Sequence, residues 1–324
     1  MQIIYKKQNL NTKHKMPRRN TLRDASIHHG NYTAIKQALV VSANYTGSSI
    51  QLNGCEIDGI KMKSFFETRN YQVTTLSETM CQQSGRKDIA PTKANMIAWV
   101  ARLASTPNLT NMAIVFSGHG TQVKDQNGDE NDGMDEAIVC HHPGGADKYP
   151  RPSDLFTDDE ILSLLRKSFE HKAVDVFLMF DACHSGTICD LGYELKQNNT
   201  WSINRRAYKR LGHEQFKSLC ISGCKDNQVS LETNGGGSMT NKFLQMSRNG
   251  NFSIRALNSG FSEMGLQSPQ ITAGQDTSLD SIFGDIIIET PNSQAARARS
   301  RRKQYRIDKR TLEKFWPFLL KVLK

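Results

Sequence analysis

A short apolar segment that ends abruptly in small and polar residues sets the strongest limit on the possible folds of this protein. Residues 174–186 read VDVFLMFDACHSG, in which six apolar residues precede an aspartate, a cysteine, a histidine and a glycine. A segment of this length, rich in β-branched and aromatic residues, predicts a buried strand, although periodicity alone does not exclude a core helix. Open α/β sheets bind ligands beyond the carboxyl ends of their strands, and Cys183 is expected at such an end.

A second segment has the same design. Residues 112–116 (MAIVF) form an apolar stretch that runs into Ser117-Gly-His-Gly. If both segments are parallel strands of one sheet, His119 and Cys183 emerge at the same edge, and the 64 residues that separate them leave room for a crossover helix. A lone cysteine is most often a small buried side chain, and a lone histidine a surface residue. Their matched positions, with flanking glycines, favour a nucleophile and its base.

Length, hydropathy and cysteine usage narrow the class of protein. The 324 residues allow one large or two ordinary domains. No apolar run reaches the roughly 18–20 residues of a membrane span, and the first twenty residues lack the apolar core of a signal peptide. The seven cysteines are an odd number without framework spacing. We therefore expect reduced thiols in an intracellular, cytoplasmic protein, with the nucleus as an alternative suggested by the basic tails.

The net charge of +10 arises from basic residues near the two ends of the chain. Residues 1–30 carry +6 and residues 295–324 carry +9, which leaves −5 for the remainder. Basic tails bind nucleic acid or anionic membranes in some proteins, but solvated disorder is the commoner outcome. No aromatic-interleaved patch or reading motif supports a nucleic-acid-binding protein. A short amphipathic segment at 311–324 is expected to dock on the body of the protein, with a membrane surface as the alternative.

The order of predicted elements indicates an α/β fold. Strands at 38–43, 71–76 and 111–117 alternate with helices at 54–68 and 91–105, which predicts a parallel sheet covered by helices on both faces. Further along, a capping box at 157–160 begins a helix that leads into the cysteine strand. The remaining expected elements are a short strand at 137–140, a strand at 216–222, a helix that follows Gly235–Gly237 and runs through Met246, a helix at 253–264 and an edge strand at 269–272, with 187–215 polar and irregular.

An acidic loop lies between the histidine and the cysteine. Residues 124–136 hold six carboxylates and two glycines. The loop is not an EF-hand, because Glu130 stands sixth from Asp125, where glycine is required. Cys220 and Cys224 lack the matching second pair of a zinc site, so neither zinc nor an organic cofactor is expected.

Two of these motifs resemble the histidine and cysteine boxes of the metacaspases, caspase-like cysteine peptidases of clan CD (family C14). They are Ser117-Gly-His-Gly-Thr and Asp181-Ala-Cys-His-Ser-Gly. Residues 53–55, 128–136 and 222–228 agree as well, so the resemblance runs in order from about 37 to 290. It implies a caspase-like α/β/α sandwich with a mainly parallel central sheet flanked by helices. The expected layout is a basic extension over 1–35, a compact type I-like peptidase domain over 36–290 and a basic tail over 291–324.

The resemblance assigns the catalytic roles. Cys183 is the nucleophile, and His119 activates it and protonates the leaving amine. The backbone N–H groups of Gly120 and Cys183 form the oxyanion hole. His184 adjoins the thiol, but adjacent side chains on an extended segment point apart, so it is expected to be structural.

Metacaspases cleave after Arg or Lys, which requires an anionic pocket because carboxylates pair with guanidinium groups. The resemblance puts Asp58, Ser117 and Asp181 around the basic side chain of the substrate. Without the resemblance, Asp58 is an exposed helix residue and Asp181 a turn-forming cap.

Many metacaspases need calcium, which prefers several oxygen ligands. The family's site maps onto Asp135, Asp158, Asp159 and Asp190. Two adjacent acids repel each other, and a bound metal would relieve that repulsion. The alternative is that Asp158 and Asp159 only favour the dipole of a helix that begins there.

Together these observations predict a calcium-stimulated cysteine endopeptidase that cleaves after Arg or Lys through a Cys–His dyad. Its expected partners are protein substrates that contain basic residues, and a monomer is the expected state. The main alternative is a catalytically silent caspase-fold scaffold or regulatory protein. A serine hydrolase is disfavoured because no G-x-S-x-G elbow occurs. The basic cluster at 196–210 is a candidate autocleavage site.

Overall fold

The structure is a computed structural model that describes residues 33–125, 133–142, 150–169, 172–183, 188–189, 191–203, 217–223, 232–233, 235–248, 252–265 and 267–274. The chain divides into two units, Met1–Thr33 and Ala34–Lys324, and nearly all described residues belong to the second. The basic tails, with the amphipathic segment predicted at 311–324, lie outside the described residues. None of the described helices has the length and apolar character that a membrane span requires.

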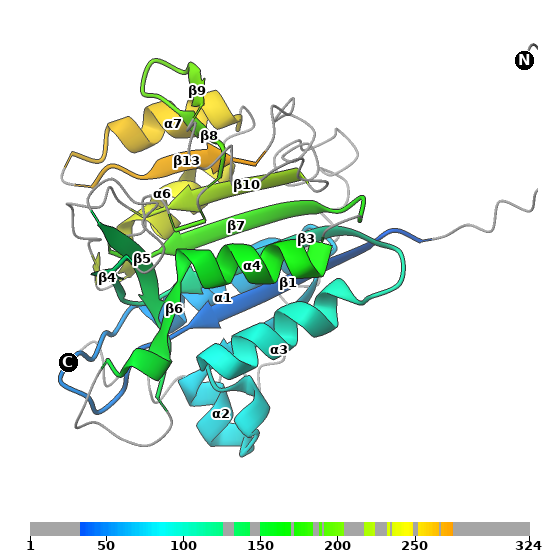
Figure 1. Cartoon of the computed structure of the whole chain (residues 1–324), viewed down its shortest axis with the longest axis vertical. Coiled ribbons are helices and arrows are strands. Elements are labelled where there is room, and N and C mark those ends of the chain that lie inside the picture. Colours follow the sequence, from blue (N-terminus) through cyan, green and yellow to red (C-terminus); the bar gives the residue numbers. More distant parts are fainter. Residues whose placement is uncertain are drawn as a thin grey trace, which may run out of the picture. The chain divides into compact units, whose positions relative to one another are not determined.

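An eight-stranded sheet forms the centre of the second unit, with the order β2-β1-β3-β7-β10-β13-β8-β9 (Figure 1). Neighbours among the first five strands pair in parallel, and β13, β8 and β9 add antiparallel pairs. The mainly parallel sheet that the sequence predicted is therefore confirmed. The strands are β1 (Ile35–Ser42), β2 (Gln72–Ser77), β3 (Leu109–Ser117), β7 (Asp175–Asp181), β8 (Tyr193–Leu195), β9 (Trp201–Ile203), β10 (Lys217–Ser222) and β13 (Gln270–Ala273).

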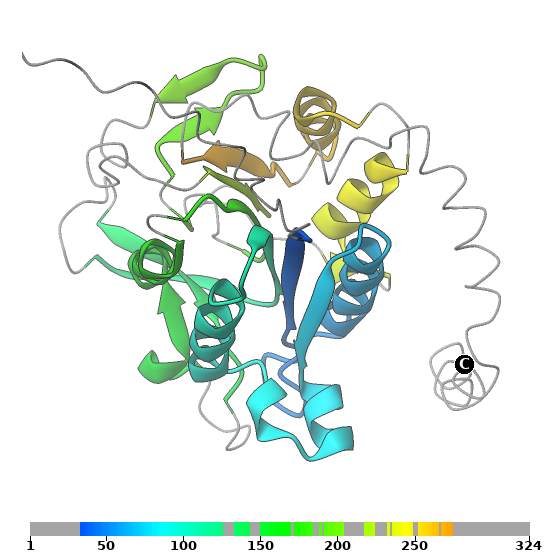
Figure 2. The same ribbon diagram turned by 90° about the vertical axis from the view of Figure 1, so that its right-hand side faces the viewer.

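Helices cover both faces of this sheet, as Figure 2 shows. Helices α3 and α4 pack on one face, and α1, α6 and α7 pack on the other. The helices are α1 (Cys55–Glu67), α2 (Glu78–Ser84), α3 (Lys93–Ala104), α4 (Asp158–Phe169), α6 (Ser238–Ser247) and α7 (Ile254–Ser262), with single 3₁₀ turns η1 (Lys87–Ile89) and η2 (Pro152–Asp154). This arrangement confirms the α/β/α sandwich.

The middle residues of the central strands β3 and β7 are apolar because these strands are buried on both faces. In β3, Met112, Ile114 and Phe116 belong to the core beneath α3 and α4, whereas Ala113 and Val115 belong to the core beneath α1 and α6. The same alternation holds in β7, whose residues divide between the two cores. A strand whose alternate residues belong to two different cores has no polar face, which explains the apolar runs in the sequence.

Two small antiparallel sheets adjoin the carboxyl ends of the parallel strands. The first contains β4 (Gly120–Lys124), β5 (Met134–Val139) and β6 (Leu155–Thr157). The second is the pair β11 (Glu232–Thr233) and β12 (Gly236–Gly237). The acidic segment 124–136 therefore connects β4 to β5, and at its two described ends the Asp125 N–H donates to the Gly133 carbonyl at 2.9 Å.

The predicted capping box of α4 is confirmed. The Glu160 N–H donates to Thr157 Oγ1 at 3.4 Å, and the Thr157 N–H donates to Glu160 Oε2 at 3.1 Å. These reciprocal bonds satisfy two N–H groups at the start of α4. They fix the start of α4, and with it the positions of the Asp158 and Asp159 side chains.

The prediction was wrong or incomplete in three places. Residues 187–215, expected to be irregular, include the hairpin β8–β9. The segment at 269–272 was expected at an edge, but β13 lies between β10 and β8 and pairs with both. The short strand expected at 137–140 corresponds to β5, whereas helix α2 and the strands β4 and β6 were not predicted, because elements this short depend on contacts with distant segments more than on their own composition.

Candidate active site

The two predicted catalytic residues lie at one edge of the sheet. Strands β3 and β7 are parallel neighbours in a register that pairs Ser117 with Asp181. The ladder continues one step further, because the Gly118 N–H donates to the Asp181 carbonyl at 3.3 Å. His119 and Cys183 each stand two residues beyond a paired position, and each is half-buried. Both side chains are thus placed at the carboxyl ends of adjacent strands, as the sequence predicted.

Gly120 brings the two strand ends into contact. A Cβ atom added to Gly120 would overlap the Cys183 carbonyl oxygen and would lie 3.3 Å from the Ala182 Cβ. Only glycine allows the main chain after His119 to pack this closely on the main chain at Cys183. The two main-chain segments predicted to carry the oxyanion-hole donors are therefore in direct contact.

His119 is oriented by the loop that follows β1. Its Nε2 lies 2.7 Å from the Ile50 carbonyl oxygen. Since a carbonyl only accepts hydrogen bonds, Nε2 carries a proton, and in the neutral ring Nδ1 is the acceptor. The His119 backbone N–H donates to Tyr45 Oη at 2.8 Å, and the two rings lie 5.0 Å apart between centroids. Neither Ile50 nor Tyr45 was predicted to lie near the site.

The three residues predicted to bind a basic side chain lie together. Ser117 Oγ donates to Asp58 Oδ2 at 2.9 Å, and the Gly237 N–H donates to the same oxygen at 2.9 Å. Asp181 Oδ2 accepts from the Thr240 N–H at 3.0 Å and from Thr240 Oγ1 at 2.7 Å. Asp58 is 1% exposed and Asp181 is 5% exposed. The alternative interpretation of Asp58 as an exposed helix residue is therefore wrong.

Two buried carboxylates in one place repel each other. Burial raises the pKa of Asp58 to about 7, and the charge of Asp181 contributes in the same direction. The hydrogen bonds from Gly237 and Ser117 and the charge of Lys61 act against this rise. Lys61 Nζ is held nearby, at 2.6 Å from Asn241 Oδ1 and in a hydrogen bond with the Gly235 carbonyl. A second cation placed between the carboxylates would remove the repulsion.

Strand β12 covers this acidic pair. A Cβ atom on Gly236 would overlap Asp58 Oδ1, and one on Gly237 would overlap Asp181 Oδ2. Gly236 has φ +101°, a conformation that side-chain-bearing residues rarely adopt. Two glycines in sequence thus let the main chain lie directly on the carboxylates.

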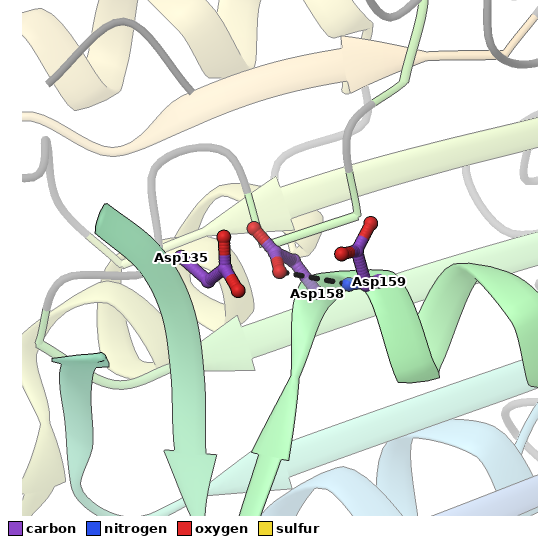
Figure 3. Close-up of side chains that lie close together, drawn as sticks. All are labelled: Asp135, Asp158 and Asp159. Carbon is purple, nitrogen blue, oxygen red and sulfur yellow. Dashed lines mark hydrogen bonds between the residues drawn. The ribbon is translucent and has the colours of Figure 1, made fainter. Parts of the chain in front are cut away.

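Three of the four predicted calcium ligands form a cluster. Figure 3 shows Asp135, at the start of β5, beside Asp158 and Asp159 in the first turn of α4. One carboxylate oxygen from each lies within 4.8 Å of the others. The Asp159 N–H donates to Asp158 Oδ1 at 2.7 Å, and the Glu136 N–H donates to Asp158 Oδ2 at 3.3 Å. The fourth predicted ligand, Asp190, lies outside the described residues.

The chemistry of this cluster suits a hard divalent cation. Asp135 and Asp158 are buried, at 3% and 1% exposure, although charged carboxylates are costly to bury. Burial raises the pKa of Asp159, and the charges of Asp125 and Glu160 add to the rise. Oxygen donors at this spacing match what Ca²⁺ binds. A helix dipole acting on Asp158 and Asp159 does not account for Asp135, which comes from a separate strand.

Comparisons with known proteins agree with this geometry. The model of the Peptidase C14 family, described as "Caspase domain", matches residues 35–274. Among curated proteins, Metacaspase-1 of Plasmodium falciparum (isolate 3D7) is 29% identical over 230 residues, covering 66% of this chain and 34% of the relative. Metacaspase-3 of Arabidopsis thaliana is 32% identical over 226 residues, covering 65% of this chain and 59% of the relative. The resemblance to metacaspases is confirmed.

Solved structures give the same fold. A crystal structure of a protein from Geobacter sulfurreducens superposes with a TM-score of 0.54 at 25% identity and covers 79% of this chain and 98% of that chain. The chain spans only 34% to 59% of the length of the two curated relatives above.

Proposed function

The chain belongs to the caspase-domain family, Peptidase C14, and from this premise we propose that it is a cysteine endopeptidase. In this proposal Cys183 is the nucleophile, His119 is the general base, and the protein cleaves after Arg or Lys with stimulation by Ca²⁺. The observation that carries the proposal is the meeting of His119, Gly120 and Cys183 at two adjacent strand ends, beside a buried pair of carboxylates.

The proposed reaction uses the imidazole tautomer set by Ile50. His119 Nδ1 takes the proton of the Cys183 thiol, and Sγ attacks the carbonyl carbon of the scissile bond. The oxygen that becomes negative accepts hydrogen bonds from the N–H groups of Gly120 and Cys183, where losing one donor costs about 2.7–4 kcal/mol. His119 then protonates the leaving amine. A water molecule, deprotonated by His119, hydrolyses the acyl-enzyme and releases the carboxylic acid.

Specificity for Arg or Lys is supported by the electrostatics of the acidic pair. A guanidinium or ammonium group beside Asp58 and Asp181 offsets their mutual repulsion and lowers the Asp58 pKa. Because the main chain of Gly236 and Gly237 lies against the two carboxylates, we assign the entry of a basic side chain to a shift of β12. The binding of the correct side chain is thus coupled to a local movement at the site.

Calcium stimulation is supported by the cluster of three aspartates, of which two are buried and one is half-buried. Asp135, Asp158 and Asp159 would hold the ion, which supplies positive charge and ties the start of β5 to the start of α4. Because β4 pairs with β5 and begins at Gly120, order in this small sheet also orders the segment next to His119. No catalytic step requires the ion itself.

The proposal is tested with fluorogenic peptides that end in Arg, Lys or Asp. Each peptide is incubated with the protein in calcium or in chelator, beside the Cys183→Ala variant. Cys81→Ser serves as the matched control, because Cys81 is a free cysteine on α2. We expect cleavage after Arg and Lys, greater in calcium, unchanged by Cys81→Ser and absent in Cys183→Ala.

The alternatives give different results. Cleavage after Asp would retain the peptidase and overturn the role of the acidic pair. Equal rates in calcium and chelator would remove the calcium proposal only. A folded protein that cleaves no peptide under any of these conditions would favour the catalytically silent scaffold.

A further inference from the structure

We infer that Tyr45 is a positioning residue for His119, held in a strained backbone conformation by the buried carboxylate of Glu78. The inference rests on the proposed function, because it concerns the same Cys–His pair. Neither residue was singled out by sequence motifs. Their role follows from the contacts that each makes.

The Tyr45 hydroxyl joins two strand ends. It accepts a hydrogen bond from the His119 N–H at 2.8 Å and donates one to the Val139 carbonyl at 2.6 Å. The Val139 N–H in turn donates to the His119 carbonyl at 2.9 Å. Three hydrogen bonds thus form a closed ring through His119, Val139 and Tyr45. The Tyr45 hydroxyl thus bridges the His119 N–H and the Val139 carbonyl, while the His119 carbonyl and the Val139 N–H bond each other directly.

The same tyrosine also contacts the imidazole. The two rings are tilted by 32° with their centroids 5.0 Å apart, while Ile50, five residues further along the same loop, binds Nε2. Tyr45 is 1% exposed, and burial raises its pKa well above the usual value of 10, so the hydroxyl keeps its proton and can donate. Residues of the 43–54 loop therefore hold both the backbone and the ring of His119 in position.

Tyr45 adopts a conformation that is unfavourable for a bulky residue. Its φ is +52°, in the left-handed region that favours glycine. Glu78 Oε1 accepts from the Tyr45 N–H at 2.6 Å, and Oε2 accepts from the Thr46 N–H at 2.9 Å. Bonds of this kind to a carboxylate are strong, and a strained residue persists where its surroundings over-determine it.

Glu78 is well suited to this task. Burial alone would raise its pKa, but hydrogen bonding and charge from His141, with the two N–H donors, outweigh that effect and hold the pKa below its usual value. The carboxylate is 2% exposed and remains ionised at neutral pH. A line of contacts thus runs from Glu78 through the Tyr45 backbone to the Tyr45 hydroxyl and the His119 ring.

The experiment compares the wild-type protein with Tyr45→Phe, which removes only the hydroxyl. Peptidase activity is measured with an Arg-terminated fluorogenic peptide. Because misplacement of a catalytic group by about 1 Å costs on the order of 100-fold, we expect kcat to fall by roughly 10- to 100-fold with KM unchanged. Tyr71→Phe is the matched control, since Tyr71 is also a buried tyrosine but belongs to a different core cluster.

A second measurement does not depend on a peptide. The rate at which iodoacetamide alkylates Cys183 is followed against pH by mass spectrometry of the labelled peptide. A thiol paired with His119 reacts below the free-thiol pKa of about 8.5. In Tyr45→Phe we expect the midpoint of this profile to move up toward that value, which a general loss of packing elsewhere would not produce.

Different failures can be told apart. A wild-type profile at the free-thiol value, with no peptide cleaved, overturns the proposed function and the inference with it. A wild-type profile below that value, shared by Tyr45→Phe together with an unchanged kcat, overturns the inference alone. If Tyr45→Phe does not fold, Glu78→Gln keeps the hydroxyl and weakens its anchor. That variant is expected to show smaller changes of the same kind, and an unchanged kcat and profile would overturn the inference.

Discussion

Replacing Asp58 by asparagine removes one of two buried carboxylates while keeping the shape of the side chain. The pKa of Asp58 is raised from 3.8 to about 7, by burial first and by Asp181 second. At 1.36 kcal/mol per pKa unit, holding Asp58 ionised in the folded protein costs about 4 kcal/mol. Asparagine carries no such charge, and its amide oxygen can keep the bonds from Ser117 and Gly237 at the Oδ2 position. Its NH₂ group replaces Oδ1, however, which accepts from the Gly237 N–H at 3.1 Å, a loss of about 1–2 kcal/mol. We therefore expect Asp58→Asn to raise the free energy of unfolding by about 2 kcal/mol at pH 8.

The sign of this effect depends on pH. Between pH 4 and pH 7 the folded wild-type protein binds a proton at Asp58 that the unfolded chain releases. The contribution of Asp58 to stability is therefore fully present near pH 4 and is lost as the pH rises to 7, at about 1.4 kcal/mol per unit. At pH 5 the wild-type carboxyl is already neutral, so there the variant should equal the wild type or be slightly less stable.

Urea unfolding in chelator at pH 5, 6, 7 and 8 measures this difference. Asp88→Asn is the control, because Asp88 is exposed and its bond with Arg86 lowers its pKa, so its titration lies below this pH range. The same Asp58→Asn protein should cleave Arg and Lys peptides about 100- to 1,000-fold more slowly, the usual cost of removing one partner of a buried charge pair. A stability difference that is the same at pH 5 and pH 8 would refute the reasoning, whatever the activity.

Three further substitutions test other contacts. Gly120→Ala should lower kcat by about 100-fold, because its Cβ overlaps the Cys183 carbonyl; unchanged peptide cleavage would contradict the close packing. Gly237→Ala should abolish cleavage after Arg and Lys by displacing Asp181, yet leave alkylation of Cys183 intact, as mass spectrometry would show. Calcium at 100 times its dissociation constant should stabilise the protein by about 2.7 kcal/mol, raising Tm by roughly 5–10 °C. In Asp159→Asn this rise should largely disappear, and a rise equal to that of the wild type would place the ion elsewhere.

The strands that could be predicted from the sequence are those whose residues are buried on both faces of the sheet. The runs that became β1, β3, β7 and β10 are apolar because each supplies two cores, so their composition alone predicts buried strands. The order of these strands with α1 and α3 then limits the connections to a parallel sheet. The missed elements lack such a signal. In β8 and β9, three residues each are held by pairing with one another and with β13, which composition does not encode.

The candidate site also contains residues that could be predicted from the sequence and residues that could not. His119 and Cys183 follow directly from apolar runs, so their placement at one edge could be inferred from the chain. Thr240, which donates two hydrogen bonds to Asp181, stands 59 positions away on α6, and Tyr45 stands 74 positions from His119. Neither lies in a pattern that indicates a function. Residues that orient a catalytic group contact it through main-chain atoms and hydroxyls, and these contacts leave little trace in a single sequence.

The two acidic centres share one physical property. Asp58 lies with Asp181, and Asp135 lies with Asp158 and Asp159, close enough for like charges to oppose folding; all of these carboxylates are buried except Asp159, which is half-buried. Local sequences that conflict with stability are commonly found at functional sites. Under the proposed function each conflict is resolved by a cation, the basic side chain of a substrate at one centre and Ca²⁺ at the other. Each cation then binds the folded protein in preference to the unfolded chain, so both ligands should stabilise the fold that they require. A protein built in this way is least stable when it has neither ligand, and the free energy released by binding is available to move β12 and to order the β4–β5 segment beside His119.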